Sequence, residues 1–177
     1  MEPLPNPLLR LGRWLRRRGP RLALELVLLL ALVWGMEAFL TRDAAHGPAP
    51  PLAGTTVSGA ELDLRALRGE PALVYFWASW CPVCRAQQGA VAAVAADHPV
   101  VTVAMRSGGP EAVRAHLAEQ GLALPTLADP EGRLAARYGV AGVPMAFVLG
   151  PEGKVRFVTR GYTTGWGLRL RLWLAGL

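Results

Sequence analysis

Apolar and polar positions divide the 177-residue chain into two parts. Leu22–Leu40 is an apolar run of nineteen residues that is interrupted only by Glu25 and Glu37. At about 1.5 Å rise per residue, a helix of this length covers roughly 28 Å, close to the thickness of a bilayer's hydrocarbon core. From Thr41 onward, short apolar runs alternate with mixed segments. The pattern therefore predicts a single N-terminal transmembrane helix followed by a folded domain.

Residues 55–177 show the alternation of a domain with both strands and helices. A hairpin is predicted over Thr55–Leu64, around Ser58-Gly59. Buried strands are predicted at Pro71–Trp77, Val100–Met105, Met145–Leu149 and Val155–Thr159. A helical turn at Arg65–Gly69 and helices at Pro82–Asp97, Pro110–Gln120 and Glu131–Tyr138 are predicted between them. Strands that alternate with helices and then close with a hairpin predict an α/β fold with a central sheet of mixed direction.

The position of the basic residues along the chain changes how the net charge of +6 is interpreted. Six of the nineteen basic residues precede the apolar run, whereas the chain after it holds 13 basic and 10 acidic residues. The nearly neutral domain argues against a nucleic-acid partner. The positive-inside rule predicts that residues 1–21 are a cytoplasmic leader, that 22–40 cross the cytoplasmic membrane, and that the domain is extracytoplasmic or periplasmic. A cleaved signal peptide is the alternative, but residues 41–51 offer only poor cleavage sites.

Residues 41–54 carry the prolines of His46-Gly-Pro-Ala-Pro-Pro51. Proline lacks a backbone N–H and fits neither a helix interior nor a central strand. These residues are therefore interpreted as a short, stiff linker between the anchor and a domain over 55–177.

The candidate chemistry lies between the first predicted buried strand and the helix that follows it. Trp80-Cys81-Pro82-Val83-Cys84 places one thiol at the helix N-terminus, where free N–H groups and the helix dipole stabilise a thiolate. Pro82 suits the first helical position. The spacing brings the second sulfur within bonding distance of the first. Cys81 is predicted to be the exposed, attacking thiol and Cys84 the resolving thiol of a thiol–disulfide exchange.

Other uses of two cysteines remain as alternatives. A static disulfide would close too small a ring to stabilise the fold much. A zinc site needs two more ligands, and the histidines lie far away in sequence with no ligand spacing. A Cu(I) site is more credible, because Cys81, Cys84 and the thioether of Met145 are soft ligands. For the exchange reaction no metal and no cofactor are expected, since no nicotinamide or flavin site fits in the chain.

Two segments carry a resemblance to a known superfamily. FWASWCPVC (76–84) resembles the FWAxWCxxC motif of the thioredoxin superfamily, and GVAGVPMAF (139–147) resembles its cis-proline loop. The resemblance implies a thioredoxin-like fold, with a cis Val143–Pro144 bond facing the cysteines and a backbone that pairs with substrate peptides. Tyr75 stands where thioredoxin itself carries a buried acid, so the resemblance identifies no proton acceptor for Cys84.

Longer segments resemble one branch of that superfamily. Residues 52–77 are similar to the N-terminal hairpin of the membrane-tethered TlpA-like proteins, and TVAMRSGG (102–109) and the tail 161–177 resemble the ScsD-type suppressors of copper sensitivity. This implies a protein-disulfide oxidoreductase with a hairpin extension, a role in copper tolerance and cell redox homeostasis, and a transmembrane thiol donor of the DsbD/ScsB kind. It also implies that Leu168–Leu174 is a helix, despite its strand-like alternation. The expected site residues are Cys81 and Cys84, supported by Trp80, Pro82, Val83, Val143 and Pro144.

Overall fold

The computed structural model describes residues 7–177; its described side chains begin at residue 20 and leave out residues 34, 37, 38 and 40. The chain divides into two compact units, Met1–Leu40 and Thr41–Leu177. Helix α1 runs over Pro7–Thr41. Among the described residues, no helix combines the length and the apolar character that a membrane span requires. The transmembrane helix at Leu22–Leu40 therefore stays a prediction, and the first six residues of the predicted leader lie outside the described part.

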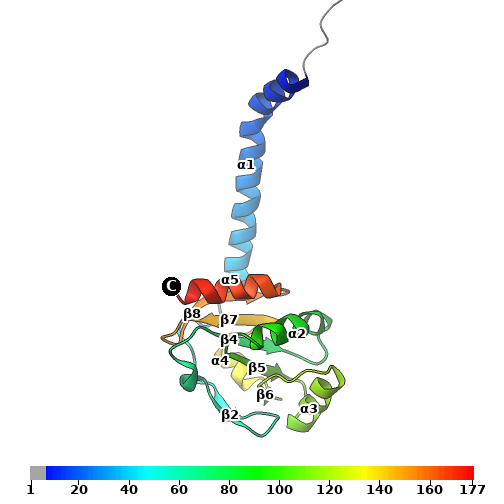
Figure 1. Ribbon diagram of the computed structural model, residues 1–177, viewed down its shortest axis with the longest axis vertical. Helices are drawn as coiled ribbons and strands as arrows, with labels where there is room; N and C mark the ends of the chain where they lie inside the picture. Colours follow the sequence, from blue (N-terminus) through cyan, green and yellow to red (C-terminus); the bar gives the residue numbers. More distant parts are fainter. Residues whose placement is uncertain (1–6) are drawn as a thin grey trace, which may run out of the picture. The chain divides into compact units, whose positions relative to one another are not determined.

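The second unit is built on a six-stranded sheet with the order β1-β8-β7-β4-β5-β6 (Figure 1). Its strands are β1 (Gly47–Pro48), β4 (Ala72–Trp77), β5 (Val100–Met105), β6 (Thr126–Asp129), β7 (Met145–Leu149) and β8 (Lys154–Arg160). Strands β4, β5 and β6 are parallel, whereas β7 is antiparallel to β4, and β8 to β7. The predicted α/β fold with a sheet of mixed direction is confirmed.

Helices and a separate hairpin surround this sheet. The helices are α2 (Pro82–Ala95), α3 (Pro110–Glu119), α4 (Arg133–Arg137), α5 (Gly165–Ala175) and the 3-10 turn η1 (Leu64–Leu67). Strands β2 (Ala53–Thr55) and β3 (Glu61–Asp63) form a two-stranded sheet of their own, which confirms the predicted hairpin. The tail is helical as predicted: Thr164 caps α5 by accepting the Gly167 N–H at 3.1 Å.

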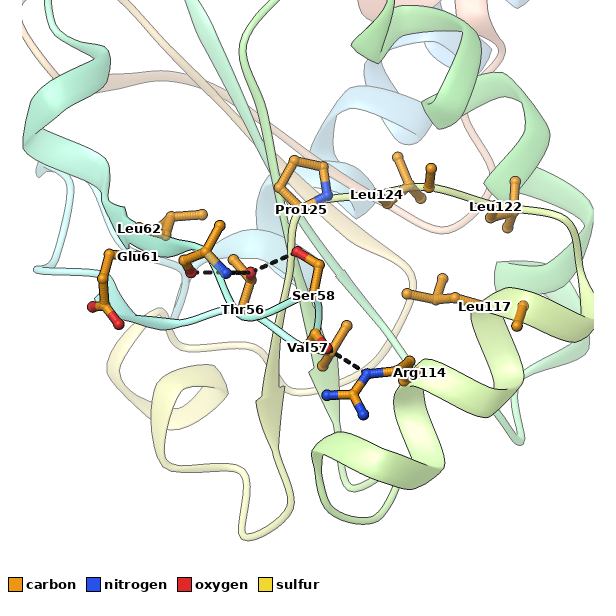
Figure 2. A pocket seen from close by; sticks show the side chains of 13 residues that line it. Thr56, Val57, Ser58, Glu61, Leu62, Arg114, Leu117, Leu122, Leu124 and Pro125 are labelled. Atoms are coloured by element: carbon orange, nitrogen blue, oxygen red, sulfur yellow. Dashed lines mark hydrogen bonds between the residues drawn. The ribbon is translucent and has the colours of Figure 1, made fainter.

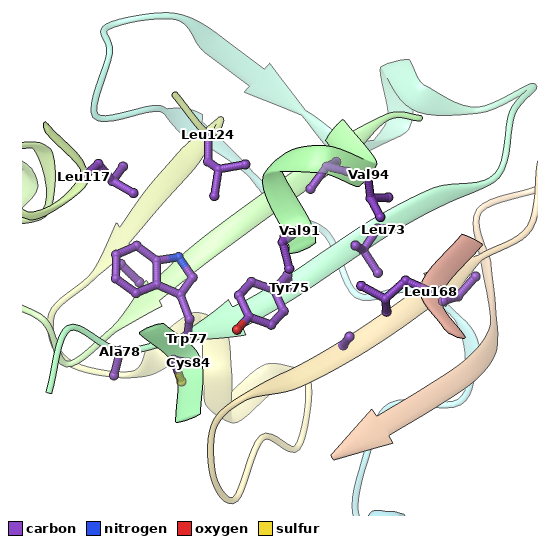
Figure 3. Close-up of a cluster of buried hydrophobic side chains, with 14 of the residues drawn as sticks. Leu73, Tyr75, Trp77, Ala78, Cys84, Val91, Val94, Leu117, Leu124 and Leu168 are labelled. Atoms are coloured by element: carbon purple, nitrogen blue, oxygen red, sulfur yellow. The ribbon is translucent and has the colours of Figure 1, made fainter. Parts of the chain in front are cut away.

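Strand β4 is buried on both faces and separates two apolar clusters. Leu73, Tyr75 and Trp77 point into the first cluster, which α2, α3 and α5 cover (Figure 3). The alternate residues of β4 point into the second cluster, which includes Tyr138 next to α4. Because both faces of β4 are packed, the position at which this strand ends is held rigidly. The dithiol segment follows directly after that end.

Residues 41–54 are part of the folded unit, in contrast to the predicted linker. Ala44 and Leu52 are buried in the second cluster. Strand β1 pairs with Lys154 and Val155 at the edge of the sheet, where a strand tolerates proline. The folded unit therefore begins at Thr41, and not at residue 55. The reason is that single apolar side chains of this proline-rich segment pack into the core. The local sequence pattern does not reveal this packing.

Strand β6 is absent from the sequence-based prediction. Its four residues directly follow Pro125 and are too few to show a strand period. It forms because it adds to β5 in parallel register, with Thr126 opposite Thr102. The hydroxyl oxygens of these two threonines lie 2.7 Å apart in the core.

Candidate active site

Helix α2 starts at the dithiol as the sequence predicts. Cys81 is the N-cap residue with an extended backbone, and Pro82 is the first helical residue. The backbone N–H of Cys84 donates a hydrogen bond to the Cys81 sulfur at 3.2 Å. This bond satisfies one of the free N–H groups of the first turn and would strengthen if Cys81 carried a negative charge. The two cysteine residues thus lie together at one end of α2.

The two thiols differ in accessibility. Cys84 is completely buried, whereas Cys81 keeps 5% of its surface exposed. Cys81 is therefore more enclosed than predicted, although it is the more accessible of the pair. Its sequence neighbours Trp80 and Val83 are 59% and 43% exposed. They form an apolar rim beside the thiol, which suits contact with a partner protein.

The loop before β7 contacts the dithiol. The Val143–Pro144 peptide bond is cis, which confirms the prediction. The Cys81 sulfur lies 3.7 Å from the Val143 carbonyl oxygen. The Pro144 carbonyl accepts a hydrogen bond from Gly161 at 2.8 Å, so this loop is tied to the end of β8. A substrate that reaches Cys81 therefore meets the backbone of Val143.

Met145 does not join the cysteines in one cluster. Its side chain is 2% exposed and packs in the second cluster, whereas Cys81 and Cys84 belong to the first. The sheet separates the two clusters. Within the described part of the chain, no three His, Cys, Asp or Glu side chains are grouped so that they could hold a metal ion.

The loop that follows β5 also supports the dithiol segment, and none of the expected site residues lies in it. The Ser107 hydroxyl accepts the backbone N–H of Ser79 at 2.9 Å and donates to the Met105 carbonyl at 3.0 Å. The Trp80 indole N–H donates to the carbonyl of Arg106 at 3.0 Å. Arg106 has a φ of 47°, a left-handed conformation that is uncommon outside glycine. Only the spatial proximity of β4 and β5 reveals this support.

Burial raises the pKa values of two side chains in the site, Cys84 and Tyr75. The pKa of Cys84 is raised, first by loss of solvent and then by its interaction with Cys81. The pKa of Tyr75 is also raised, first by burial and then by negative charge on Cys84 and Cys81. At neutral pH, Cys84 is therefore a neutral thiol and has to lose its proton in order to react.

This buried thiol predicts a loss of stability at alkaline pH. A thiol whose pKa is raised by folding stabilises the native state fully below its ordinary value of 9.0, and that contribution falls as pH rises toward the raised value. For the reduced protein we expect this group to lower the free energy of unfolding by about 1 kcal/mol between pH 8 and pH 10. Urea unfolding of wild type and of Cys84→Ser at both pH values measures the difference. Equal losses in the two proteins would contradict this assignment.

A separate pocket lies away from the cysteines. It has a volume of about 560 Å³ and is bordered by the β2–β3 hairpin, α3 and the segment before β6 (Figure 2). The Arg114 side chain closes one side by donating to the Val57 carbonyl at 2.7 Å. Leu117, Leu122 and Leu124 form the apolar part of its wall. None of the predicted site residues lines this pocket.

Comparison with known proteins agrees with this geometry. A thioredoxin-like protein of Haemophilus influenzae is 38% identical over 125 residues, which cover 70% of this chain and 72% of the relative. The thiol-disulfide oxidoreductase ResA of Geobacillus thermodenitrificans is 28% identical over 152 residues, which cover 81% of this chain and 87% of ResA.

A solved structure shows the same fold. The crystal structure of a thiol:disulfide interchange protein of the thioredoxin family from Chlorobium tepidum superposes with a TM-score of 0.65 at 26% identity. The match covers 75% of this chain and 98% of that one. The fold is therefore thioredoxin-like. Residues 46–158 match the AhpC/TSA family, and the chain belongs to that family.

Proposed function

We propose that this protein is a membrane-tethered thiol–disulfide oxidoreductase that reduces disulfides of extracytoplasmic proteins. The activity class is supported by relatives that are named thiol-disulfide oxidoreductase or thiol:disulfide interchange protein. The observation that carries it is the Cys81 sulfur at the start of α2, held between the Cys84 N–H and the Val143 carbonyl. No other described group combines a thiol, a helix N-terminus and an adjacent second thiol.

The reaction has two steps. The Cys81 thiolate attacks one sulfur of a substrate disulfide, which forms a mixed disulfide and releases the other substrate sulfur as a thiolate. Cys84 then loses its proton and attacks the Cys81 sulfur. The second substrate sulfur leaves and takes up a proton, and Cys81 and Cys84 are left as a disulfide. Two electrons have passed from the protein to its substrate.

A further turnover needs two electrons from outside. We propose a transmembrane thiol donor of the DsbD/ScsB kind, which would reduce the Cys81–Cys84 disulfide by the reverse exchange. We assign substrate and donor contacts to two surfaces. One is the apolar rim of Trp80 and Val83 together with the exposed Pro82, and the other is the loop of Val143 and Pro144. Trp80 and Val83 supply apolar area, and the Val143 backbone supplies a hydrogen-bonding edge.

The tether and the reducing direction are supported by the sequence. The arginine-rich leader followed by the apolar run Leu22–Leu40 favours an N-terminus in the cytoplasm and a domain outside it. Membrane tethering suits a protein that receives electrons from a membrane-bound donor better than it suits an oxidant that has to diffuse freely. The Pro82-Val83 dipeptide lacks the histidine of the strongly oxidising motif of DsbA, so an extreme oxidising potential is not expected.

Copper handling is the alternative, and the structure weakens it. It would use Cys81, Cys84 and Met145, but the Met145 thioether packs in the cluster on the other face of the sheet. A protective role in copper tolerance, as in ScsD-type proteins, would then come from disulfide reduction and not from metal binding.

The proposal is tested by fractionating cells with and without the DsbD-type transmembrane reductase and alkylating thiols before electrophoresis. We expect the full-length protein in the membrane fraction of both strains, with Cys81 and Cys84 reduced in the first and oxidised in the second. Oxidised cysteines in both strains would make the protein a disulfide-forming oxidant or isomerase. A soluble protein that begins near Ala45 would contradict the tether.

A further inference from the structure

Several buried polar atoms have no hydrogen-bond partner among the described residues, among them the Gln87 Oε1 atom of α2 and the Tyr75 hydroxyl of β4. The Tyr75 hydroxyl is completely buried and makes no hydrogen bond of normal geometry with any described residue. Burying a hydroxyl without a partner costs about 1–3 kcal/mol. By contrast, the equally buried Tyr138 donates its hydroxyl to the Pro50 carbonyl at 2.8 Å. The Tyr75 hydroxyl therefore has a proton that it can donate to a neighbouring group that gains negative charge.

The hydroxyl is directed at the resolving thiol. Tyr75 lies on β4 and shares the first cluster with Cys84. Figure 3 shows its hydroxyl pointing toward Cys84, on the side of the sheet that α2 covers. Negative charge on Cys84 raises the pKa of Tyr75, behind burial as the main cause, so the phenol keeps its proton and is available as a donor.

Other ionisable side chains of the core are not among the groups that shift the pKa of Tyr75. Asp129 is the one buried carboxyl side chain in the described part of the chain, and it accepts the N–H groups of Leu134 and Ala135 at the start of α4. His116 of α3 stacks on Trp77 with ring centroids 5.3 Å apart, and its buried Nε2 atom has no hydrogen-bond partner among the described residues. From α2 and the loop before it, Cys84 and Cys81 are the titratable groups that act on Tyr75.

We propose that Tyr75 is a positioning residue for the resolving step, in which its hydroxyl donates a hydrogen bond to the Cys84 sulfur as that sulfur becomes a thiolate and attacks Cys81. Tyr75 keeps its proton throughout. The proton from Cys84 ends on the departing substrate sulfur by way of solvent. This hydrogen bond gives the buried Cys84 thiolate a partner that it otherwise lacks. Because hydrogen bonds to charged groups are the strong ones, its loss slows resolution about tenfold or more.

The test uses Tyr75→Phe in the reduced full-length protein, mixed with one equivalent of 5,5′-dithiobis(2-nitrobenzoate). Attack by Cys81 releases a first nitrothiobenzoate and leaves a mixed disulfide, and attack by Cys84 releases a second. We expect the first phase at the wild-type rate and the second about tenfold slower. The second phase of the variant should also rise at higher pH than that of wild type, while the pH profile of the first phase is unchanged.

Tyr138→Phe is the matched control. It removes the hydroxyl of an equally buried tyrosine, so it should lower the midpoint of urea unfolding and leave both kinetic phases unchanged. Tyr75→Phe removes an unpaired hydroxyl and should leave that midpoint equal or higher. A wild-type second phase in Tyr75→Phe at all pH values, or an equal slowing in Tyr138→Phe, would overturn the proposal. This inference rests on the dithiol exchange of the proposed function; a wild-type protein without a second phase would instead refute that exchange itself.

Discussion

Cys84→Ser will leave the protein covalently joined to its substrates, whereas Cys81→Ser will not form such complexes. With serine at position 84, Cys81 still attacks a substrate disulfide, but no buried thiol follows to release the product. With serine at position 81, the group at the start of α2 is a hydroxyl, which is a far weaker nucleophile than a thiolate. We therefore expect disulfide exchange by Cys81→Ser to fall to the level of a protein that lacks both cysteines.

The measurement is non-reducing electrophoresis of each variant from cells, followed by identification of the attached proteins. The double variant Cys81→Ser/Cys84→Ser is the control, because it lacks both sulfurs. Complexes that accumulate with Cys81→Ser instead would reverse the two roles. Tight stoichiometric binding of Cu(I) by wild type, without any disulfide exchange, would favour the copper alternative. The attached proteins would also identify the pathway.

Leu172→Ala will destabilise the domain by about 2–5 kcal/mol, which is the usual cost of truncating a fully buried leucine. Leu172 lies in the first cluster with no exposed surface, on the inner face of α5. Its neighbour Leu170 is 55% exposed on the outer side of the same helix. Leu170→Ala is therefore a matched control with the same change in volume and helix, and should stay within about 0.5 kcal/mol of wild type.

Urea unfolding of the reduced proteins gives both values. Equal losses for the two leucines would mean that α5 is not docked through Leu172. Because Leu168 and Leu172 belong to the same cluster as Cys84, detachment of α5 would also expose part of that cluster to solvent. A loss of exchange activity by Leu172→Ala at temperatures where it remains folded would show this coupling directly.

The sequence by itself determined the parts of this protein whose signals are local. The continuous apolar run before Trp77 predicts a strand buried on both faces, and Pro82 predicts the start of the next helix. The two-residue spacing of Cys81 and Cys84 predicts neighbouring thiols at that start. The cis bond before Pro144 followed from its resemblance to a known loop and not from local pattern.

Only the tertiary structure decided which side chains complete the core and the site. Residues 41–54 look like a linker because their prolines exclude regular elements, yet Ala44 and Leu52 fill the second cluster. Strand β6 exists because β5 offers it an edge for pairing. Ser107 supports Ser79 because parallel strands β4 and β5 end side by side. The direction of the Tyr75 hydroxyl depends on how α2 packs across β4. These are contacts between distant segments, and a local pattern of polar and apolar residues carries no information about which distant surface will meet it.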